Sequence, residues 1–220
     1  MGIRHKTLYL IRHGQTHSNV DGRFQGSDEP LTTEGRGQAI KLGDRLGREH
    51  KAHPITTLIS STHVRALETA TLVGRAIGLT PIASPLFVER KHPTYIHGKL
   101  TTDPDALTIW NQGRAHFHNP DFIYADGENF ALLKARALDG LAYILALPDL
   151  HIGLVTHGVF ATALLAASQR GNALTSYDLN TYQFRLENAA LSILAHETRH
   201  TFSEVGDGWI VERWGDIAHL

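Results

Sequence analysis

Short apolar runs alternate along this 220-residue chain with longer segments in which apolar residues recur every three or four positions. Runs of the first kind have the length of β-strands, and segments of the second kind have the periodicity of amphipathic helices. Alternation of the two is typical of a mostly parallel sheet with helices on both faces. The chain is therefore predicted to fold as an α/β three-layer sandwich.

The run Ile152–Thr156 is almost wholly apolar, as expected of a central parallel strand that is buried on both faces. Gly78 and Pro148 follow two helical segments and are expected to end them. Strands are predicted near residues 7–11, 57–60, 81–83, 152–156, 183–186, 190–196 and 209–214. Helices are predicted from residue 32 or 33 to 50, at 64–77 and at 128–147, with a short helix after Gly158.

Residues 90–126 interrupt the alternation, and they are rich in aromatic residues and histidines. We expect them to form an irregular insertion, or lid, over the C-terminal edge of the strands, with a helix around residues 104–115. The chain contains no internal repeat and no linker-like segment. Residues 1–220 are therefore predicted to be a single domain that carries this insertion.

The composition disfavours several classes of protein. A net charge of −1 gives no overall attraction to nucleic acid or to an anionic membrane, so neither is expected as a partner. The chain has no cysteine, which excludes disulfides and thiol nucleophiles and fits a reducing compartment. The first strand begins too early to leave room for a signal peptide, so a cytoplasmic location is expected. The uncharged stretch 152–168 contains Thr156-His157-Gly158, which favours a strand, turn and helix over a membrane span.

Three predicted strands end in polar residues that belong to the same edge of the sheet. The segments are Arg12-His13-Gly14, Ser61-Thr62-His63-Val64-Arg65 and Thr156-His157-Gly158. Ligands of open α/β sheets bind at the carboxyl ends of the strands, so two arginines and two histidines should gather there. Arginine offers a planar fork for phosphate oxygens, and a neutral imidazole is a nucleophile near neutral pH. The sequence therefore predicts phosphate chemistry at this edge.

Several ordered blocks across the chain match one family. The matching residues are Leu10–Thr16 and Asn19, Gly22–Asp28, Pro30–Thr32, Gly35, Gln38 and Ala39, Ser60, Ser61, Arg65, Ala66, Thr69 and Ala70, Leu86 and Glu89, Gly127 and Glu128, and Val155–Gly158. Together they resemble the histidine phosphatase superfamily, in the branch shared with cofactor-dependent phosphoglycerate mutases. The resemblance implies a metal-independent phosphatase without a cofactor, acting on a small phosphorylated metabolite.

The resemblance also implies roles for individual residues. His13 is expected to attack phosphorus as the neutral base and to become phosphohistidine, with its other nitrogen held by a backbone carbonyl. Arg12, Arg65 and His157 are expected to bind the phosphate. Glu89 is similar to the family's proton donor, with a solvated loop carboxylate as the alternative. Further residues expected to bind phosphate or substrate are Asn19, Thr16, Gln25, Gly26, Arg90 and Gly158.

The segment after Glu89 departs from the family's common pattern, because Gly-x-Trp-Glu-Gly is absent from it. This leaves Glu128 as a second candidate for the acid, although its position at a predicted helix start favours a supporting role. Arg90-Lys91-His92 is either a solvated charge run or the site of a second anionic group of the substrate. The pair His116 and His118 has no carboxylates at ligand spacing, so no metal site is expected.

Segments rich in Trp and Arg, which are typical of true mutases, are not evident, and this favours a phosphatase. The alternatives are phosphoryl transfer of the phosphoglycerate mutase type and a catalytically weak module that binds a phosphorylated ligand. Neither the substrate nor the oligomeric state follows from the sequence, and a homodimer is one option.

Overall fold

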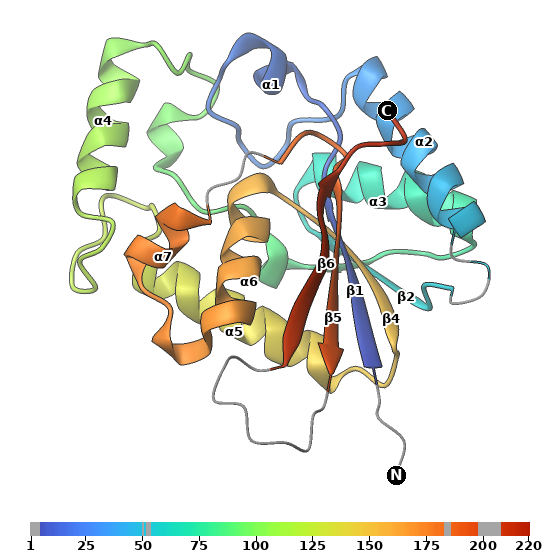
Figure 1. Cartoon of the computed structure of the whole chain (residues 1–220). Helices are drawn as coiled ribbons and strands as arrows, with labels where there is room; N and C mark the ends of the chain where they lie inside the picture. The colour runs from blue at the N-terminus through green and yellow to red at the C-terminus, as the bar shows by residue number, and fades with distance from the viewer. Residues whose placement is uncertain (1–4, 50, 52–53, 183–185, 198–207) are drawn as a thin grey trace.

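The computed structural model describes residues 5–49, 51, 54–182, 186–197 and 208–220. Its centre is a six-stranded sheet with the strand order β3-β2-β4-β1-β5-β6 (Figure 1). The strands are β1 (His5–Arg12), β2 (Thr57–Ser61), β3 (Ile82–Ser84), β4 (His151–Thr156), β5 (Leu191–Glu197) and β6 (Trp209–Asp216). Strands β1 to β4 are parallel to one another, whereas β5 is antiparallel to both of its neighbours, β1 and β6.

Helices cover both faces of the sheet, as predicted (Figure 1). The helices are α1 (His17–Asp21), α2 (Thr33–Glu49), α3 (Val64–Ile77), α4 (Pro104–Ala115), α5 (Phe130–Ala146), α6 (Gly158–Arg170) and α7 (Ser176–Thr181). Helix α3 ends where the sequence predicts, because Gly78 adopts φ 75° and its N–H bonds the Gly74 carbonyl.

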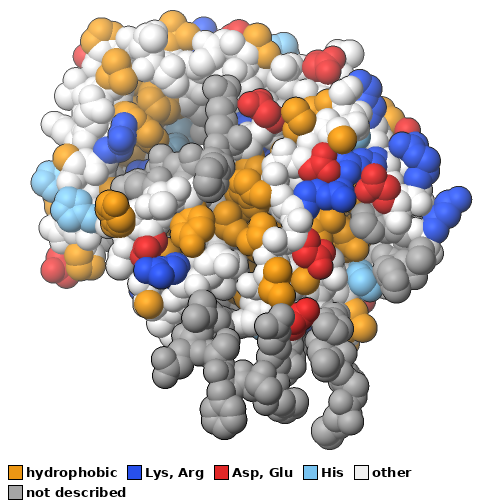
Figure 2. All heavy atoms as spheres, in the orientation of Figure 1, with side chains coloured by type: hydrophobic (Ala, Val, Ile, Leu, Met, Phe, Trp, Pro, Cys, Tyr) orange, Lys and Arg blue, Asp and Glu red, His pale blue; other side chains and the backbone are white. Residues whose placement is uncertain are grey.

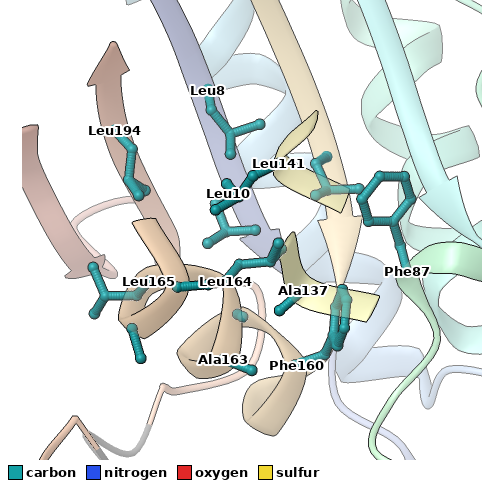
Figure 3. Close-up of a cluster of buried hydrophobic side chains, with 14 of the residues drawn as sticks. Leu8, Leu10, Phe87, Ala137, Leu141, Phe160, Ala163, Leu164, Leu165 and Leu194 are labelled. Atoms are coloured by element: carbon teal, nitrogen blue, oxygen red, sulfur yellow. The ribbon is translucent and has the colours of Figure 1, made fainter. Parts of the chain in front are cut away.

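Alternation along β1 sends side chains into two separate cores. Leu8 and Leu10 pack with α5 and α6 on one face (Figure 3), whereas Tyr9 and Ile11 pack with α2 and α3 on the other. Side chains that alternate in this way are what a strand covered on both faces requires. Arg12 and His13 follow directly, so burial of β1 fixes where these two side chains emerge.

The insertion lies beyond the carboxyl ends of the parallel strands, on the same side as α1 (Figure 1). Phe24 anchors it, because its N–H bonds the Lys99 carbonyl at 3.0 Å and its carbonyl accepts from Gly98 at 2.8 Å. The Phe24 ring also packs against Trp110 of α4, with 5.3 Å between ring centroids. The insertion is thus held to the loop that follows β1, above the predicted phosphate site.

Four details differ from the sequence predictions. No helix is predicted between the first strand and residue 32, but Thr16 caps the five-residue helix α1 there. Helix α5 begins at Phe130 rather than at residue 128, because the Asn129 side chain accepts from the Leu132 N–H and caps it. Helix α7 was not predicted. Of the strand predicted at 183–186, residues 183–185 lie outside the described part, and Leu186 is not in a strand.

Charged side chains of both signs are intermingled on the face shown in Figure 2, where hydrophobic side chains gather near the centre. This distribution agrees with the near-zero net charge of the sequence. None of the helices in the described part of the chain is long and apolar enough to cross a membrane.

Candidate active site

His13 lies at the carboxyl end of β1, and only 1% of its surface is exposed. Its Nδ1 lies 2.8 Å from the Gly14 carbonyl oxygen, which can only accept, so Nδ1 carries the proton. The lone pair is therefore on Nε2, where it accepts from Arg65 Nε at 3.2 Å. The backbone thus holds the imidazole in the tautomer that a nucleophilic Nε2 requires.

Arg65 is the second residue of α3 and is as deeply buried as His13. Each nitrogen of its guanidinium has its own partner. Nε donates to His13, Nη1 donates to the Gly26 carbonyl at 2.6 Å, and Nη2 lies 3.3 Å from Nδ1 of His63. Gly26 therefore contributes a carbonyl that orients the guanidinium beside His13.

His157 follows β4 and is fully buried. Its Nε2 lies 2.8 Å from Ser61 Oγ at the end of β2, and its ring centroid lies 5.1 Å from that of His13. Within the described part of the chain, Nδ1 of His157 is buried and has no hydrogen-bond partner. A buried polar atom without a partner is costly, so this nitrogen has an unused capacity for one hydrogen bond.

Burial and positive charge act in the same direction on these groups. Burial, followed by the charge of Arg65, lowers the pKa of both His13 and His157 well below the usual value of 6.5. The same two causes lower the pKa of His63 to about 4. Burial also lowers the pKa of Arg65, to about 10, so its guanidinium stays charged at neutral pH. The site therefore combines neutral imidazoles with a fixed cation.

Two glycines allow the loop after β1 to contact α2 closely. A Cβ on Gly14 would lie 2.5 Å from the Gly35 carbonyl oxygen, and a Cβ on Gly35 would lie 2.1 Å from the Gln15 carbonyl oxygen. Both distances are far shorter than van der Waals contact, so neither position has room for a side chain. This contact fixes the backbone immediately after His13.

Arg12 and Gly158 face each other at the ends of β1 and α6. The Arg12 guanidinium donates through Nη1 to the Leu186 carbonyl. A Cβ on Gly158 would lie 3.5 Å from Arg12 Nε, so glycine leaves the space that this guanidinium occupies. Both residues line a cavity of about 700 Å³, and they are the sequence neighbours of His13 and His157.

Three further residues predicted to bind phosphate or substrate, Thr16, Asn19 and Gln25, form one hydrogen-bonded group around α1. Asn19 Oδ1 accepts from the backbone N–H of Thr16 at 3.1 Å, and Gln25 Nε2 donates to Thr16 Oγ1 at 2.5 Å. Asn188 Nδ2 donates to Asn19 Oδ1 at 3.1 Å and to the His13 carbonyl at 3.2 Å. The group is thereby connected to the backbone of His13.

Glu89 and Arg90 lie between two cavities and line both of them. The Glu89 carboxylate accepts from the backbone N–H groups of Arg90 and Phe160, both at 2.9 Å, and of Val159 at 3.2 Å. The Arg90 guanidinium lies 4.0 Å from the Phe117 ring centroid and 5.4 Å from that of Trp110. Its Nε is buried without a hydrogen-bond partner among the described residues. Arg90 is thus packed between aromatic rings and is not part of a solvated charge run.

Glu128 lines neither of the two cavities that Glu89 lines. Its two carboxylate oxygens accept from Arg136 at 2.9 and 2.7 Å, and only 5% of the side chain is exposed. This environment favours the supporting role for Glu128, whereas Glu89 lines a cavity together with His63 and Arg65.

Sequence reasoning gave no individual role to His63 or Asn188. His63 lies within the segment 61–65, two residues after the end of β2, and this position is the only sequence signal for it. Asn188 belongs to a turn far along the chain, and no spacing pattern connects it with His13. Among the described residues, no group of three or more His, Cys, Asp or Glu side chains is placed to hold a metal ion.

Comparison with known proteins identifies the family of the chain. The model of the histidine phosphatase superfamily (branch 1) matches residues 8–208. A probable phosphoglycerate mutase, GpmB of Proteus mirabilis, is 31% identical, and the match covers 97% of this chain and 94% of the relative.

Two solved structures share the fold. One is a putative alpha-ribazole-5'-P phosphatase from Escherichia coli, with a TM-score of 0.77 at 22% identity and 97% coverage of both chains. The other is a mycobacterial glucosyl-3-phosphoglycerate phosphatase, with a TM-score of 0.74 at 24% identity, covering 96% of this chain and 99% of the other.

Proposed function

Because the chain belongs to the histidine phosphatase superfamily (branch 1), we propose that it removes phosphate from a monoester of a small metabolite through a phosphohistidine on His13. The observation that carries this proposal is the contact between Arg65 Nε and His13 Nε2, with Gly14 holding the other ring nitrogen. A neutral nucleophile and a fixed cation therefore meet at one point, as attack on a phosphate requires.

The proposed reaction has two steps. His13 Nε2 forms a bond to phosphorus while the bond to the leaving oxygen breaks, and Glu89 gives that oxygen a proton. Glu89 then takes a proton from water, the water oxygen bonds phosphorus, and His13 is released. Arg12, Arg65 and His157 stabilise the charge on the phosphoryl oxygens, so the reaction needs no metal.

The cavity of about 700 Å³ supports a leaving group of metabolite size. It adjoins Glu89, the proposed proton donor, and Arg90, which is the residue that we propose to bind a second anionic group of the substrate. Room for water next to Glu89 favours hydrolysis over transfer. The lack of cysteine supports the further proposal that the enzyme works in a reducing cytoplasm.

Mutase activity is the second candidate, because a relative at 31% identity is a probable phosphoglycerate mutase. The same phosphohistidine would return its phosphoryl group to the substrate instead of to water. Release of inorganic phosphate from a phosphoglycerate separates the two candidates, since a mutase interconverts the isomers and releases little phosphate.

The test of the proposed function is release of phosphate from a panel of phosphorylated metabolites by the wild-type protein and by His13→Ala. His17→Ala is the matched control, because His17 is exposed on the neighbouring helix α1. We expect His13→Ala to lose turnover, His17→Ala to keep it, and a strong chelator to leave the wild type active. Normal turnover by His13→Ala would overturn the proposal.

A further inference from the structure

Arg136 of α5 binds the backbone of the segment that carries Glu89. Its Nη1 donates to the carbonyls of Leu86 at 3.1 Å and Val88 at 2.6 Å, and its Nη2 reaches the carbonyl of Glu89 at 3.4 Å. Val88 and Glu89 belong to no helix or strand, so their carbonyls have no partners within regular structure. One side chain therefore organises the backbone up to the proposed acid.

Glu128 completes the arrangement on the other side of Glu89. It pairs with Arg136 through Nε at 2.9 Å and Nη2 at 2.7 Å, and it accepts from the Lys91 N–H at 3.2 Å. The Lys91 carbonyl in turn accepts from the Glu128 N–H at 3.0 Å. The residues before and after Glu89 are thus tied to one ion pair, whose side chains are 13% and 5% exposed.

The same guanidinium also supports the group that holds the Glu89 carboxylate. Arg136 lies over the ring of Phe160, 4.2 Å from its centroid, and the Phe160 N–H donates to Glu89 Oε1 at 2.9 Å. Arg136 is therefore in contact with both the backbone and the carboxylate-binding partner of Glu89. Lysine could not make these contacts together, because they use the separate donors of a planar fork.

We propose that Arg136, held by Glu128, is a positioning residue that sets the distance from the Glu89 carboxyl group to the leaving oxygen. This inference rests on the proposed function, in which Glu89 gives its proton to that oxygen as the bond to phosphorus breaks. Proton transfer requires the two heavy atoms within hydrogen-bond reach, so a displacement of about 1 Å is enough to slow it. Neither Arg136 nor Glu128 lines the cavity of about 700 Å³, so neither is placed to touch the substrate there.

The experiment compares two substrates that differ in their need for an acid. p-Nitrophenolate leaves without a proton, whereas the alkoxide of glycerol phosphate must be protonated as it leaves. Arg136→Lys and Glu128→Gln should each lower kcat/KM for both substrates. The fold-loss for glycerol phosphate should be at least about ten times the fold-loss for p-nitrophenyl phosphate. Inhibition by inorganic phosphate should stay within about twofold of the wild type, since the phosphate site is intact.

Lys134→Met is the matched control. Lys134 lies on the same helix and also binds two backbone carbonyls, those of Asn172 at 2.7 Å and Leu174 at 2.9 Å, but neither belongs to the segment that carries Glu89. Its loss should affect both substrates equally. Glu89→Gln should show the largest difference between the substrates, and adding Arg136→Lys to it should enlarge that difference little, because both act through one proton.

Equal losses on the two substrates in both Arg136→Lys and Glu128→Gln would overturn the positioning role. If Arg136→Lys does not fold, Glu128→Gln still decides the question, because an amide keeps the size of the side chain while removing its charge. Failure of the proposed function is a separate result. In that case Glu89→Gln itself would treat the two substrates alike, or His13→Ala would turn over normally.

Discussion

Arg65 donates from Nε to Nε2 of His13 across 3.2 Å, and both side chains are 1% exposed. The two residues are 52 positions apart in the chain and come from the first turn of α3 and the end of β1. The parallel sheet brings them together, because β1 and β2 flank β4 and end at the same edge. The contact places a fixed cation beside the lone pair of a neutral imidazole.

Replacing Arg65 by lysine should lower kcat/KM by about 10²–10³, because lysine keeps the charge but cannot hold His13, Gly26 and His63 at once. Steady-state kinetics on the best substrate of the panel measures the loss. Arg36→Lys is the control, since Arg36 forms an exposed pair with Glu68 and should change activity less than about twofold. Similar losses in the two variants would contradict the role of Arg65.

The pH dependence of kcat/KM should follow His13 on its acidic side. Burial and then Arg65 lower the pKa of His13 well below 6.5, so the nucleophile stays neutral far into the acidic range. The acidic limb should therefore lie well below pH 6.5. An acidic limb centred at or above 6.5 would contradict the neutral His13.

Gly35→Ala should destabilise the fold by about 1–3 kcal/mol, because its Cβ would lie 2.1 Å from the Gln15 carbonyl oxygen. Gly37→Ala on the same helix is the matched control. A Cβ there meets nothing within 4 Å, so the substitution should stabilise by about 0.5–1 kcal/mol through helix propensity. Urea unfolding of the two variants measures both changes, and equal stability would be the contrary result.

His92 should make stability depend on pH. Burial, followed by the charges of Arg90 and His97, lowers the pKa of His92 from 6.5 to about 3 in the folded state. The unfolded chain then binds more protons between these values, so the contribution of His92 is complete above 6.5 and is lost as pH falls toward about 3. His92→Gln should therefore lose less stability than the wild type between about pH 7 and pH 5 in urea titrations. Parallel losses in the two proteins would rule this out.

Much of the architecture is predictable because local signals and tertiary packing agree. The periodicity of 64–77 with Gly78 predicts α3 to the residue, and Pro104 predicts the start of α4. Helix α1 escapes prediction because it is only five residues long and depends on the reciprocal bonds between Thr16 and Asn19. The start of α5 differs because Asn129, and not Glu128, supplies the cap.

Some residues of the site are predictable from the sequence and others are not. Arg12, His13, Arg65 and His157 follow strand ends, so the topology of a parallel sheet predicts that they meet. The position of Arg136 does not follow from any spacing, because its carbonyl partners lie 47 to 50 residues earlier, in a short 3-10 helix and in the coil that follows it. Contacts between a side chain and distant coil depend on tertiary packing, which a single sequence does not display.

The central claim is that a phosphoryl group passes through His13. The most direct measurement mixes the enzyme with a substrate labelled in its phosphate, quenches within the first turnover in base, and locates the label by mass spectrometry. We predict that the label appears transiently on the peptide carrying His13, with the acid lability of a phosphoramidate, and that it is absent in His13→Ala. Turnover in which no label is found on His13 at any time would contradict the account.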